Sequence, residues 1–259
     1  MQKGKKVALV LATGGARGLA HIGVIEELIR QNYSISSVAG CSMGAFVGAA
    51  FASGYWNECK EVLCNINRKT IFQFVDFSLS RKGIIGGRKM YKKMEQIFSD
   101  TKIEDLKIPF TAVATNILNQ QEVIFNQGKI IDALRASISL PFIFKPYEFN
   151  NMSLIDGGLL NPLPLDKVSR TTDDILIGVS VGAKKNVLKT YNKFSLLMDS
   201  AAMIVQTNIR KSCIEIKPDL MIEVPAGDYS IFNFKKYTEL VEEGAKATQK
   251  ALQAYSLPV

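Results

Sequence analysis

The chain has 259 residues, with 32 lysines and arginines, 24 aspartates and glutamates, and one histidine. Its hydrophobic share of 47% supports a large core and excludes a disordered chain. The single histidine, His21, excludes a metal site with two histidine ligands, and a Ser-His-Asp triad would require His21 as its base. The net charge of +8 suits an anionic partner such as nucleic acid or lipid, and serves plain solubility equally well.

Cysteine usage favours a reducing compartment, so we expect a cytoplasmic protein. Cys41, Cys59, Cys64 and Cys213 form neither a CxxC pair nor a metal-ligand spacing, and they are too sparse for a disulfide framework. The apolar run at 7–12 is too short for a signal peptide, and no run reaches the roughly 20 apolar residues of a membrane-spanning helix. We therefore expect no transmembrane segment, no metal and no cofactor.

The first part of the chain alternates strand and helix patterns. Continuous apolar residues predict buried strands at 7–11 and 35–39, and apolar residues at helical spacing predict a helix at 19–31. Residues 44–54 are almost wholly Ala, Phe, Val and Gly, which predicts a helix buried on all sides. This order implies parallel strands joined by right-handed crossovers.

Residues 60–100 differ from the rest of the chain because they interleave positive charge with aromatic side chains. They hold nine lysines and arginines against four acidic residues, with helices predicted near 58–65 and 89–98. The interleaved aromatics are Phe72, Phe74, Phe77, Tyr91 and Phe98. One interpretation is a lid-like insertion packed on the core, and the other is a peripheral contact with a membrane surface. No nucleic-acid-binding motif accompanies the charge, so we expect no nucleic-acid partner.

The remaining patterns continue the alternation. Strands are predicted at 110–115, 122–125, 148–155, 174–181 and 220–224, with turns at 116–121 and 150–151. Helices are predicted at 130–138, 194–216 and 235–255. Because no repeat or linker interrupts the pattern, we predict one α/β domain over residues 1–259, with the insertion near 60–100.

A glycine-rich stretch, Thr13-Gly14-Gly15-Ala16-Arg17-Gly18, lies between the first strand and the first helix, and we call it the glycine loop. Such a loop leaves backbone N–H groups free beside a helix N-terminus, where they bind a phosphate or an oxyanion.

The glycine loop also resembles the cofactor loop of short-chain dehydrogenases. That chemistry needs a tyrosine followed four positions later by a lysine, and none of the eight tyrosines has one. No carboxylate follows the second strand to bind a ribose, so this interpretation is set aside.

A second motif, Gly40-Cys41-Ser42-Met43-Gly44, follows the second strand and opens the buried helix. Gly-x-Ser-x-Gly between a strand and a helix is typical of a nucleophile elbow, a sharp turn that needs glycines beside the serine. The serine then lies at a helix N-terminus, whose dipole favours an alkoxide or oxyanion. The motif predicts Ser42 as a nucleophile.

A nucleophilic serine needs a proton acceptor, and the sequence offers two. His21 lies in the first turns of the helix after the glycine loop, where it serves as the base, orients the loop or simply packs. Asp156 ends an apolar strand in Leu154-Ile155-Asp156-Gly157-Gly158, and the glycines allow other groups to approach its carboxylate. A carboxylate beside a serine in a partly apolar site works as a base without an imidazole.

The glycine loop, the Ser42 elbow and the Asp156-Gly-Gly motif, in this order, resemble the signature of patatin-like phospholipases. Residues 14–23, 134–141 and 156–164 fit the bacterial branch of that family, and the resemblance spans roughly residues 7–182. It implies a three-layer α/β/α patatin-like fold with a mostly parallel central sheet. One departure is Thr13, which replaces the first glycine of the usual run and enters positive φ less readily.

The resemblance also implies a catalytic dyad, with Ser42 as nucleophile and Asp156 as general base, and no catalytic role for His21. The implied oxyanion hole is formed by the backbone N–H groups of Gly14, Gly15 and Ala16. The implied supporting residues are Arg17, Gly18, Gly40, Gly44, Gly157 and Gly158. The implied activity is a lipid acyl hydrolase acting on phospholipids, lysophospholipids or other fatty-acyl esters. A thioesterase or transacylase with the same dyad, and a non-catalytic regulatory protein, are the alternatives.

Overall fold

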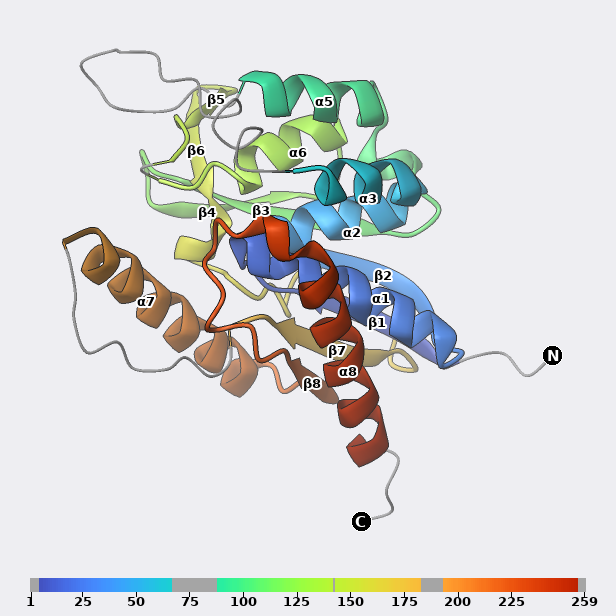
Figure 1. Cartoon of the computed structure of the whole chain (residues 1–259). Helices are drawn as coiled ribbons and strands as arrows, with labels where there is room; N and C mark the ends of the chain where they lie inside the picture. Colours follow the sequence, from blue (N-terminus) through green and yellow to red (C-terminus); the bar gives the residue numbers. More distant parts are fainter. Residues whose placement is uncertain (1–4, 67–87, 142, 183–192, 256–259) are drawn as a thin grey trace.

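The computed structural model describes residues 5–66, 88–141, 143–182 and 193–255 (Figure 1). Their centre is an eight-stranded sheet in the order β5-β6-β3-β2-β1-β7-β8, with β4 paired to β3 as well. The strands are β1 (Lys6–Leu11), β2 (Ser34–Cys41), β3 (Phe110–Asn116), β4 (Gln121–Phe125), β5 (Tyr147–Phe149), β6 (Met152–Asp156), β7 (Ile175–Ser180) and β8 (Leu220–Glu223). Strands β3, β2, β1, β7 and β8 are parallel, and β4, β5 and β6 add antiparallel pairs at one end.

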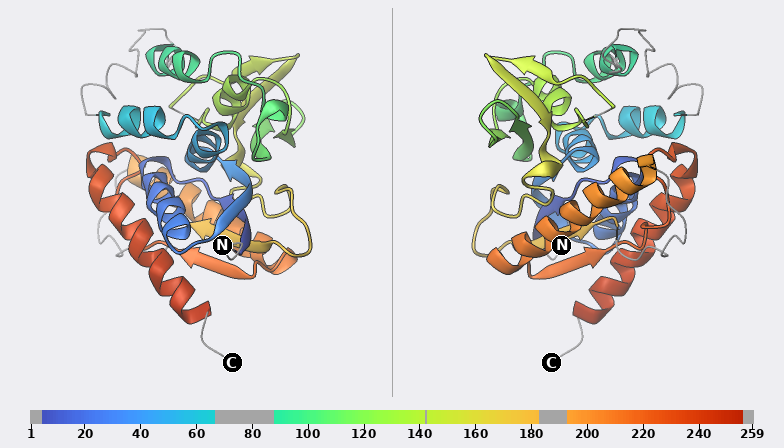
Figure 2. Two further views of the ribbon diagram at one scale, coloured as in Figure 1. Left: turned by 90° about the vertical axis from the view of Figure 1, so that its right-hand side faces the viewer. Right: turned by 90° about the vertical axis from the view of Figure 1, so that its left-hand side faces the viewer.

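Helices cover both faces of this sheet (Figures 1 and 2). They are α1 (Ala20–Arg30), α2 (Met43–Ser53), α3 (Trp56–Cys64), α5 (Arg88–Phe98), α6 (Ile130–Ser137), α7 (Lys193–Glu215) and α8 (Tyr237–Tyr255), with 3₁₀ turns η1 (Gly15–Leu19), η2 (Ile103–Asp105), η3 (Gly157–Leu159) and η4 (Phe234–Lys236). Alternate residues of β1 join different cores. Val7 and Leu9 pack in the cluster of α1, α2 and α8, whereas Ala8 and Val10 pack with Ile209 of α7. The predicted three-layer α/β/α fold with a mostly parallel sheet is confirmed.

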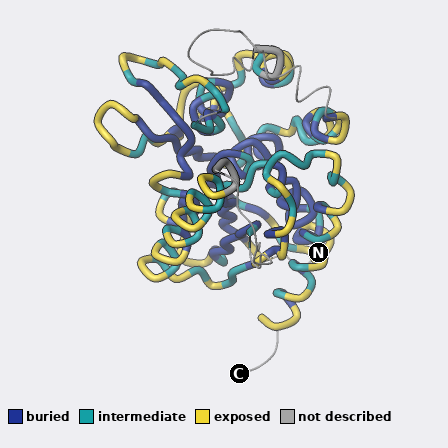
Figure 3. Tube along the Cα trace, turned by 60° about the vertical axis from the view of Figure 1, so that its left-hand side comes forward, coloured by how far each residue is buried: buried dark blue, intermediate teal, exposed yellow. Residues whose placement is uncertain are grey.

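The predicted elements are confirmed in the described residues, with ends that shift by a few positions. Buried residues follow the strands and the inner helix faces (Figure 3). The strand pattern at 148–155 is a hairpin of β5 and β6, and its turn residues Asn150 and Asn151 both have positive φ. Among the described helices, none combines the length and apolar character needed to cross a bilayer.

The insertion predicted near 60–100 is described only at its two ends. Residues 67–87, with Phe72, Phe74 and Phe77, lie outside the described residues. The ends form α3 and α5, whose Leu63, Met94 and Phe98 are buried in the core. These ends therefore pack on the domain, while the membrane contact stays a prediction.

Strand β3 carries two different strands on one edge. Its first half pairs with β2, in which Cys41 lies opposite Val113, and its second half pairs with β6, in which Asp156 lies opposite Ala114. Strand β4 overlaps both pairings, so it occupies the other edge, and β2 and β6 must share the first. Because β2 is parallel to β3 and β6 is antiparallel, their C-terminal ends meet at adjacent residues of β3. The topology thus brings Asp156 beside the turn that follows Cys41.

Helices α1 and α8 touch backbone to backbone. A Cβ at Gly23 of α1 would lie 1.9 Å from the carbonyl oxygen of Val241, and one at Gly244 of α8 would lie 2.0 Å from that of Ala20. Both clashes are with main chain, which cannot move aside as a side chain can. The crossing of the two helices therefore depends on these two glycines.

We expect Gly23→Ala and Gly244→Ala to destabilise the fold, although the same change in an open helix usually stabilises it. Overpacking of this kind costs roughly 1–3 kcal/mol of unfolding free energy, measured by urea denaturation. Gly48→Ala in α2 is the control, because the three atoms nearest to its Cβ all belong to side chains, the nearest being Val38 at 2.8 Å. Equal losses in all three variants would contradict the backbone-contact explanation.

Candidate active site

Ser42 lies in a strained turn between β2 and α2. Its φ of 55° and ψ of −120° are unfavourable for a residue with a side chain, so the surrounding structure must hold them. The flanking glycines allow the turn. A Cβ at Gly40 would lie 2.5 Å from the carbonyl carbon of Gly44, and one at Gly44 would lie 2.3 Å from the carbonyl oxygen of Leu11. The turn thus has the sharp, glycine-dependent form that the Gly-x-Ser-x-Gly motif predicts.

Asp156 lies at the end of β6 and is only 2% exposed. Its Oδ1 accepts hydrogen bonds from the backbone N–H of Gly158 at 2.8 Å and from the thiol of Cys41 at 3.7 Å. Gly157 and Gly158 begin η3, so the carboxylate caps this short turn. Its second oxygen, Oδ2, is buried and has no hydrogen-bond partner among the described residues.

Burial raises the pKa of Asp156 from 3.8 to about 6. The Ser42 hydroxyl, the Gly158 N–H and the Cys41 thiol oppose this effect, because each stabilises the charged carboxylate. The Ser42 hydroxyl is close enough to act on the pKa, yet the contact falls short of hydrogen-bond geometry, since Oδ2 has no partner. At neutral pH the group is mostly ionised and holds one oxygen ready to accept a proton.

The glycine loop lies beside Ser42, and its N–H groups differ in their engagement. Ala16 N–H donates to the carbonyl oxygen of Ile231 at 2.8 Å, and Arg17 N–H donates to that of Gly14 at 3.2 Å. In the described part of the chain, Gly14 N–H and Gly15 N–H have no such partner. Of the three N–H groups expected to face an oxyanion, the one of Ala16 is therefore occupied in this conformation.

Arg17 and Gly18 fix the glycine loop to its neighbours. Arg17 Nε donates to the carbonyl oxygen of Tyr229 at 2.6 Å. Burial lowers the pKa of the guanidinium, and Asp199 and Asp228 oppose that change. Gly18 lies against Met43, which a Cβ would approach to 2.5 Å. The loop is thus held between the start of α2 and a segment near the end of the chain.

His21 is fully buried and points into the core under the glycine loop. Its Nε2 donates to the carbonyl oxygen of Ala12 at 2.9 Å, while its Nδ1 has no partner in the described structure. Burial lowers the pKa of His21 to about 4, so the ring is neutral at pH 7. This geometry favours the loop-orienting interpretation of His21.

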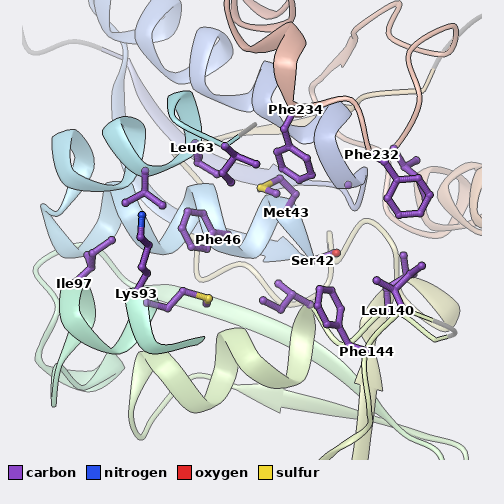
Figure 4. Close-up of a pocket in the computed structure, with 17 residues that line it drawn as sticks. Ser42, Met43, Phe46, Leu63, Lys93, Ile97, Leu140, Phe144, Phe232 and Phe234 are labelled. Carbon is purple, nitrogen blue, oxygen red and sulfur yellow. The ribbon is translucent and has the colours of Figure 1, made fainter. Parts of the chain in front are cut away.

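An apolar cavity of about 200 Å³ opens beside Ser42. Figure 4 shows Ile97 and Lys93 at one end, Phe46 between them and Ser42, and Phe232 and Leu140 on the far side of Ser42. The lining residues are Gly15, Ser42, Met43, Phe46, Val62, Leu63, Ile66, Lys93, Met94, Ile97, Ile138, Leu140, Ile143, Phe144, Ile231, Phe232 and Phe234. Only Lys93 among these carries a charge, so the cavity suits an apolar group.

Sequence reasoning assigned no role in the site to several residues that the structure places there. Ile231, Phe232 and Phe234 close the cavity from the C-terminal part, and the Ser42 N–H donates to the buried Ser137 Oγ at 2.8 Å. The aromatic cluster at 232–234 was a signal in the sequence, but nothing local tied it to residue 42. In the described residues there is no group of three or more His, Cys, Asp or Glu that could hold a metal ion.

Comparison with known proteins gives one matching family model. The model "Patatin-like phospholipase" matches residues 9–168. An uncharacterized NTE family protein of Mycobacterium tuberculosis is 40% identical over 180 residues, which cover 70% of this chain and 50% of that protein. Lysophospholipase NTE1 of Candida glabrata is 26% identical, over 97% of this chain and 16% of its own length. The chain thus spans about half, or less, of these relatives.

A solved structure supports the same fold. VipD from Legionella pneumophila aligns with a TM-score of 0.52 at 15% sequence identity. The alignment covers 98% of this chain and 67% of that protein. At this identity the likeness concerns the fold alone.

We expect Asp156→Asn to stabilise the protein above pH 6. The folded pKa of about 6 exceeds the ordinary 3.8, so ionisation costs stability that is intact below pH 3.8 and lost as the pH rises through 6. A pKa shift of about two units corresponds to at most roughly 3 kcal/mol. We therefore expect Asp156→Asn to gain about 1–3 kcal/mol of unfolding free energy, measured by urea denaturation. The gain should shrink toward pH 4. A gain that does not depend on pH, or a loss at pH 8, would contradict this account.

Proposed function

The chain belongs to the patatin-like phospholipase family, and we propose that it hydrolyses fatty-acyl esters of phospholipids or lysophospholipids with a Ser42–Asp156 dyad. The observation that carries the proposal is the meeting of β2 and β6 on one edge of β3, which brings a carboxylate with a raised pKa beside a serine in a strained turn. The name of the yeast relative, a lysophospholipase, agrees with the substrate class.

The proposed reaction proceeds through an acyl-enzyme. Ser42 Oγ attacks the ester carbonyl carbon while Asp156 accepts the hydroxyl proton. The tetrahedral intermediate collapses, the C–O bond to the leaving alcohol breaks, and Asp156 returns the proton to that alcohol. Asp156 then takes a proton from water, whose oxygen attacks the acyl carbonyl carbon. The bond from that carbon to Ser42 Oγ breaks, Asp156 returns the proton to Ser42 Oγ, and the fatty acid leaves. A pKa of about 6 suits this exchange near neutral pH, because the group is ionised yet binds a proton readily.

The negative charge of the tetrahedral intermediate needs donors in the glycine loop. We propose the N–H groups of Gly14 and Gly15, which have no backbone partner among the described residues, and Gly15 lines the cavity. Ala16 N–H joins them only if it leaves the Ile231 carbonyl oxygen. The N-terminus of α2 adds a favourable dipole, and donors aimed at an oxyanion typically lower the barrier by about 3–4 kcal/mol each.

We propose that the apolar cavity holds the acyl chain. Its lining consists almost wholly of aliphatic and aromatic side chains, and Ser42 is one of the lining residues. An acyl chain in this cavity would keep its carbonyl carbon near Ser42 Oγ. The residues around the reaction come from widely separated parts of the sequence, 14–42, 156 and 231–234, so we propose that residues 1–259 act as one catalytic domain.

We expect Ser42→Ala to lose labelling by a fluorophosphonate probe, and Asp156→Asn to slow it at least about 100-fold, because each removes one half of the proton transfer. Buried controls carry the same changes away from the site: Ser37→Ala on β2 and Asp174→Asn before β7. His21→Ala should still react if it folds. Labelling of Ser42→Ala at the wild-type rate would refute the proposal.

For the wild type, kcat/KM on a lysophospholipid should fall below an apparent pKa of about 6, because protonated Asp156 cannot accept a proton. Phospholipid, aryl ester and acyl-CoA panels separate the lipase from a thioesterase, and the absence of turnover on all of them would favour a regulatory role. An acid limb below pH 4.5 would contradict the assignment of Asp156 as the base.

We expect Ile97→Trp to shift preference toward shorter acyl chains. Ile97 lies at the end of the cavity far from Ser42, so a larger side chain shortens the space without touching the reacting atoms. The ratio of kcat/KM for a long-chain over a short-chain ester should drop about tenfold, as expected when a pocket rejects one or two methylenes. Ile29→Trp on the exposed side of α1 is the control. An unchanged ratio would exclude the cavity as the acyl site.

A further inference from the structure

The stretch 134–141 fits the family pattern, but neither the elbow nor the base motif explains it. In the structure this stretch is the end of α6 and the turn that follows. Ser137 Oγ accepts a hydrogen bond from the Ser42 N–H at 2.8 Å. Two residues later, the carbonyl oxygen of Ser139 accepts the Asp156 N–H at 2.9 Å. One short segment thus bonds to the backbone of both dyad residues.

We propose that Ser137 is a positioning residue that fixes the Ser42 turn at the distance and angle which the Asp156 carboxylate requires. The proposal rests on the proposed function. Ser137 does not touch the reacting atoms and acts only through the backbone of Ser42. Its partner in this arrangement, Ser139, contributes a main-chain carbonyl oxygen and not its side chain.

The need for such a residue follows from the strain in the turn. Ser42 has a φ of 55°, which an L-residue leaves readily unless its peptide groups are held. Its N–H group points into the interior, where no water is available to replace a lost acceptor, and Ser137 is fully buried. The hydroxyl of Ser137 therefore favours the strained conformation over a relaxed one.

The same segment also sets the spacing of the dyad. Ser137 is the last residue of α6 and Ser139 follows two positions later, so both acceptors belong to one short stretch of chain. The Ser42 hydroxyl acts on the pKa of Asp156, but Asp156 Oδ2 has no hydrogen-bond partner among the described residues. A small displacement of the turn would therefore separate them further, and shifts of about 1 Å cost catalysis up to about 100-fold.

The chain offers a control outside the segment that bonds to the dyad. Ser37 on β2 is also a buried serine, and its Oγ has no hydrogen-bond partner among the described residues. Ser37→Ala therefore removes a buried hydroxyl but no hydrogen bond to Ser42 or Asp156. Ser137→Ala removes the acceptor of the Ser42 N–H.

We expect kcat of Ser137→Ala on a lysophospholipid to fall about 10- to 100-fold with KM within about threefold, since positioning acts on the transition state more than on binding. Hydrogen exchange of the Ser42 amide should quicken at least about tenfold, because its acceptor is gone. Ser37→Ala should keep both values near wild type. Ser137→Cys fills the site with a slightly larger sulfur, which is a weaker acceptor, and should lose kcat in the same direction even if Ser137→Ala does not fold.

The proposal is overturned if folded Ser137→Ala or Ser137→Cys matches Ser37→Ala in kcat, or if the exchange of the Ser42 amide stays unchanged. A loss that appears in KM alone would also overturn it. Failure of the proposed function looks different, because the wild type itself would then neither turn over lipid esters nor react with the fluorophosphonate probe at Ser42. The exchange measurement still tests the bond from Ser137 in that case.

Discussion

The arrangement of this site depends on one edge of β3. Two strands that run in opposite directions share that edge end to end, so their last residues meet at Val113 and Ala114. Neither strand needs an unusual length or loop to bring Ser42 and Asp156 together. The hydrogen bonds of a sheet, which are the most rigid part of an α/β domain, therefore set their separation. The glycines of the elbow and of η3 then let helix and loop backbones approach this point.

Burial of the carboxylate is the main energetic cost of this arrangement. Asp156 receives one backbone N–H and one thiol on Oδ1, which is too little to offset the loss of water, and its pKa rises accordingly. An amide of the same shape would avoid the cost but would lose the capacity to take up a proton. The strained φ of Ser42 adds to this cost in the same place. Both features destabilise the fold, and packing in the surrounding layers must offset them, as at other sites where function and stability compete.

Much of the fold was predictable because its signals are local. Apolar periodicity located the helices and strands, and the turns at 40–44 and 150–151 followed from their glycines and asparagines. The pairing of Asp156 with Ala114 was not predictable from these patterns, because it depends on which of two edges a distant strand takes. For the same reason sequence reasoning counted the Ala16 N–H as free, although a residue more than 200 positions away occupies it. The acceptor role of Ser137 likewise follows from long-range packing alone.

The glycine loop is held by hydrogen bonds to residues late in the sequence, from Ala16 to Ile231 and from Arg17 to Tyr229. This order matters during biosynthesis, because the ribosome synthesises the chain from its N-terminus. Ser42 and Asp156 have both been synthesised once residue 156 is added, whereas Tyr229 and Ile231, which bind the glycine loop, follow some 70 residues later. The nascent chain thus contains the Ser42 turn and the Asp156 carboxylate before it contains the residues that hold the glycine loop in place.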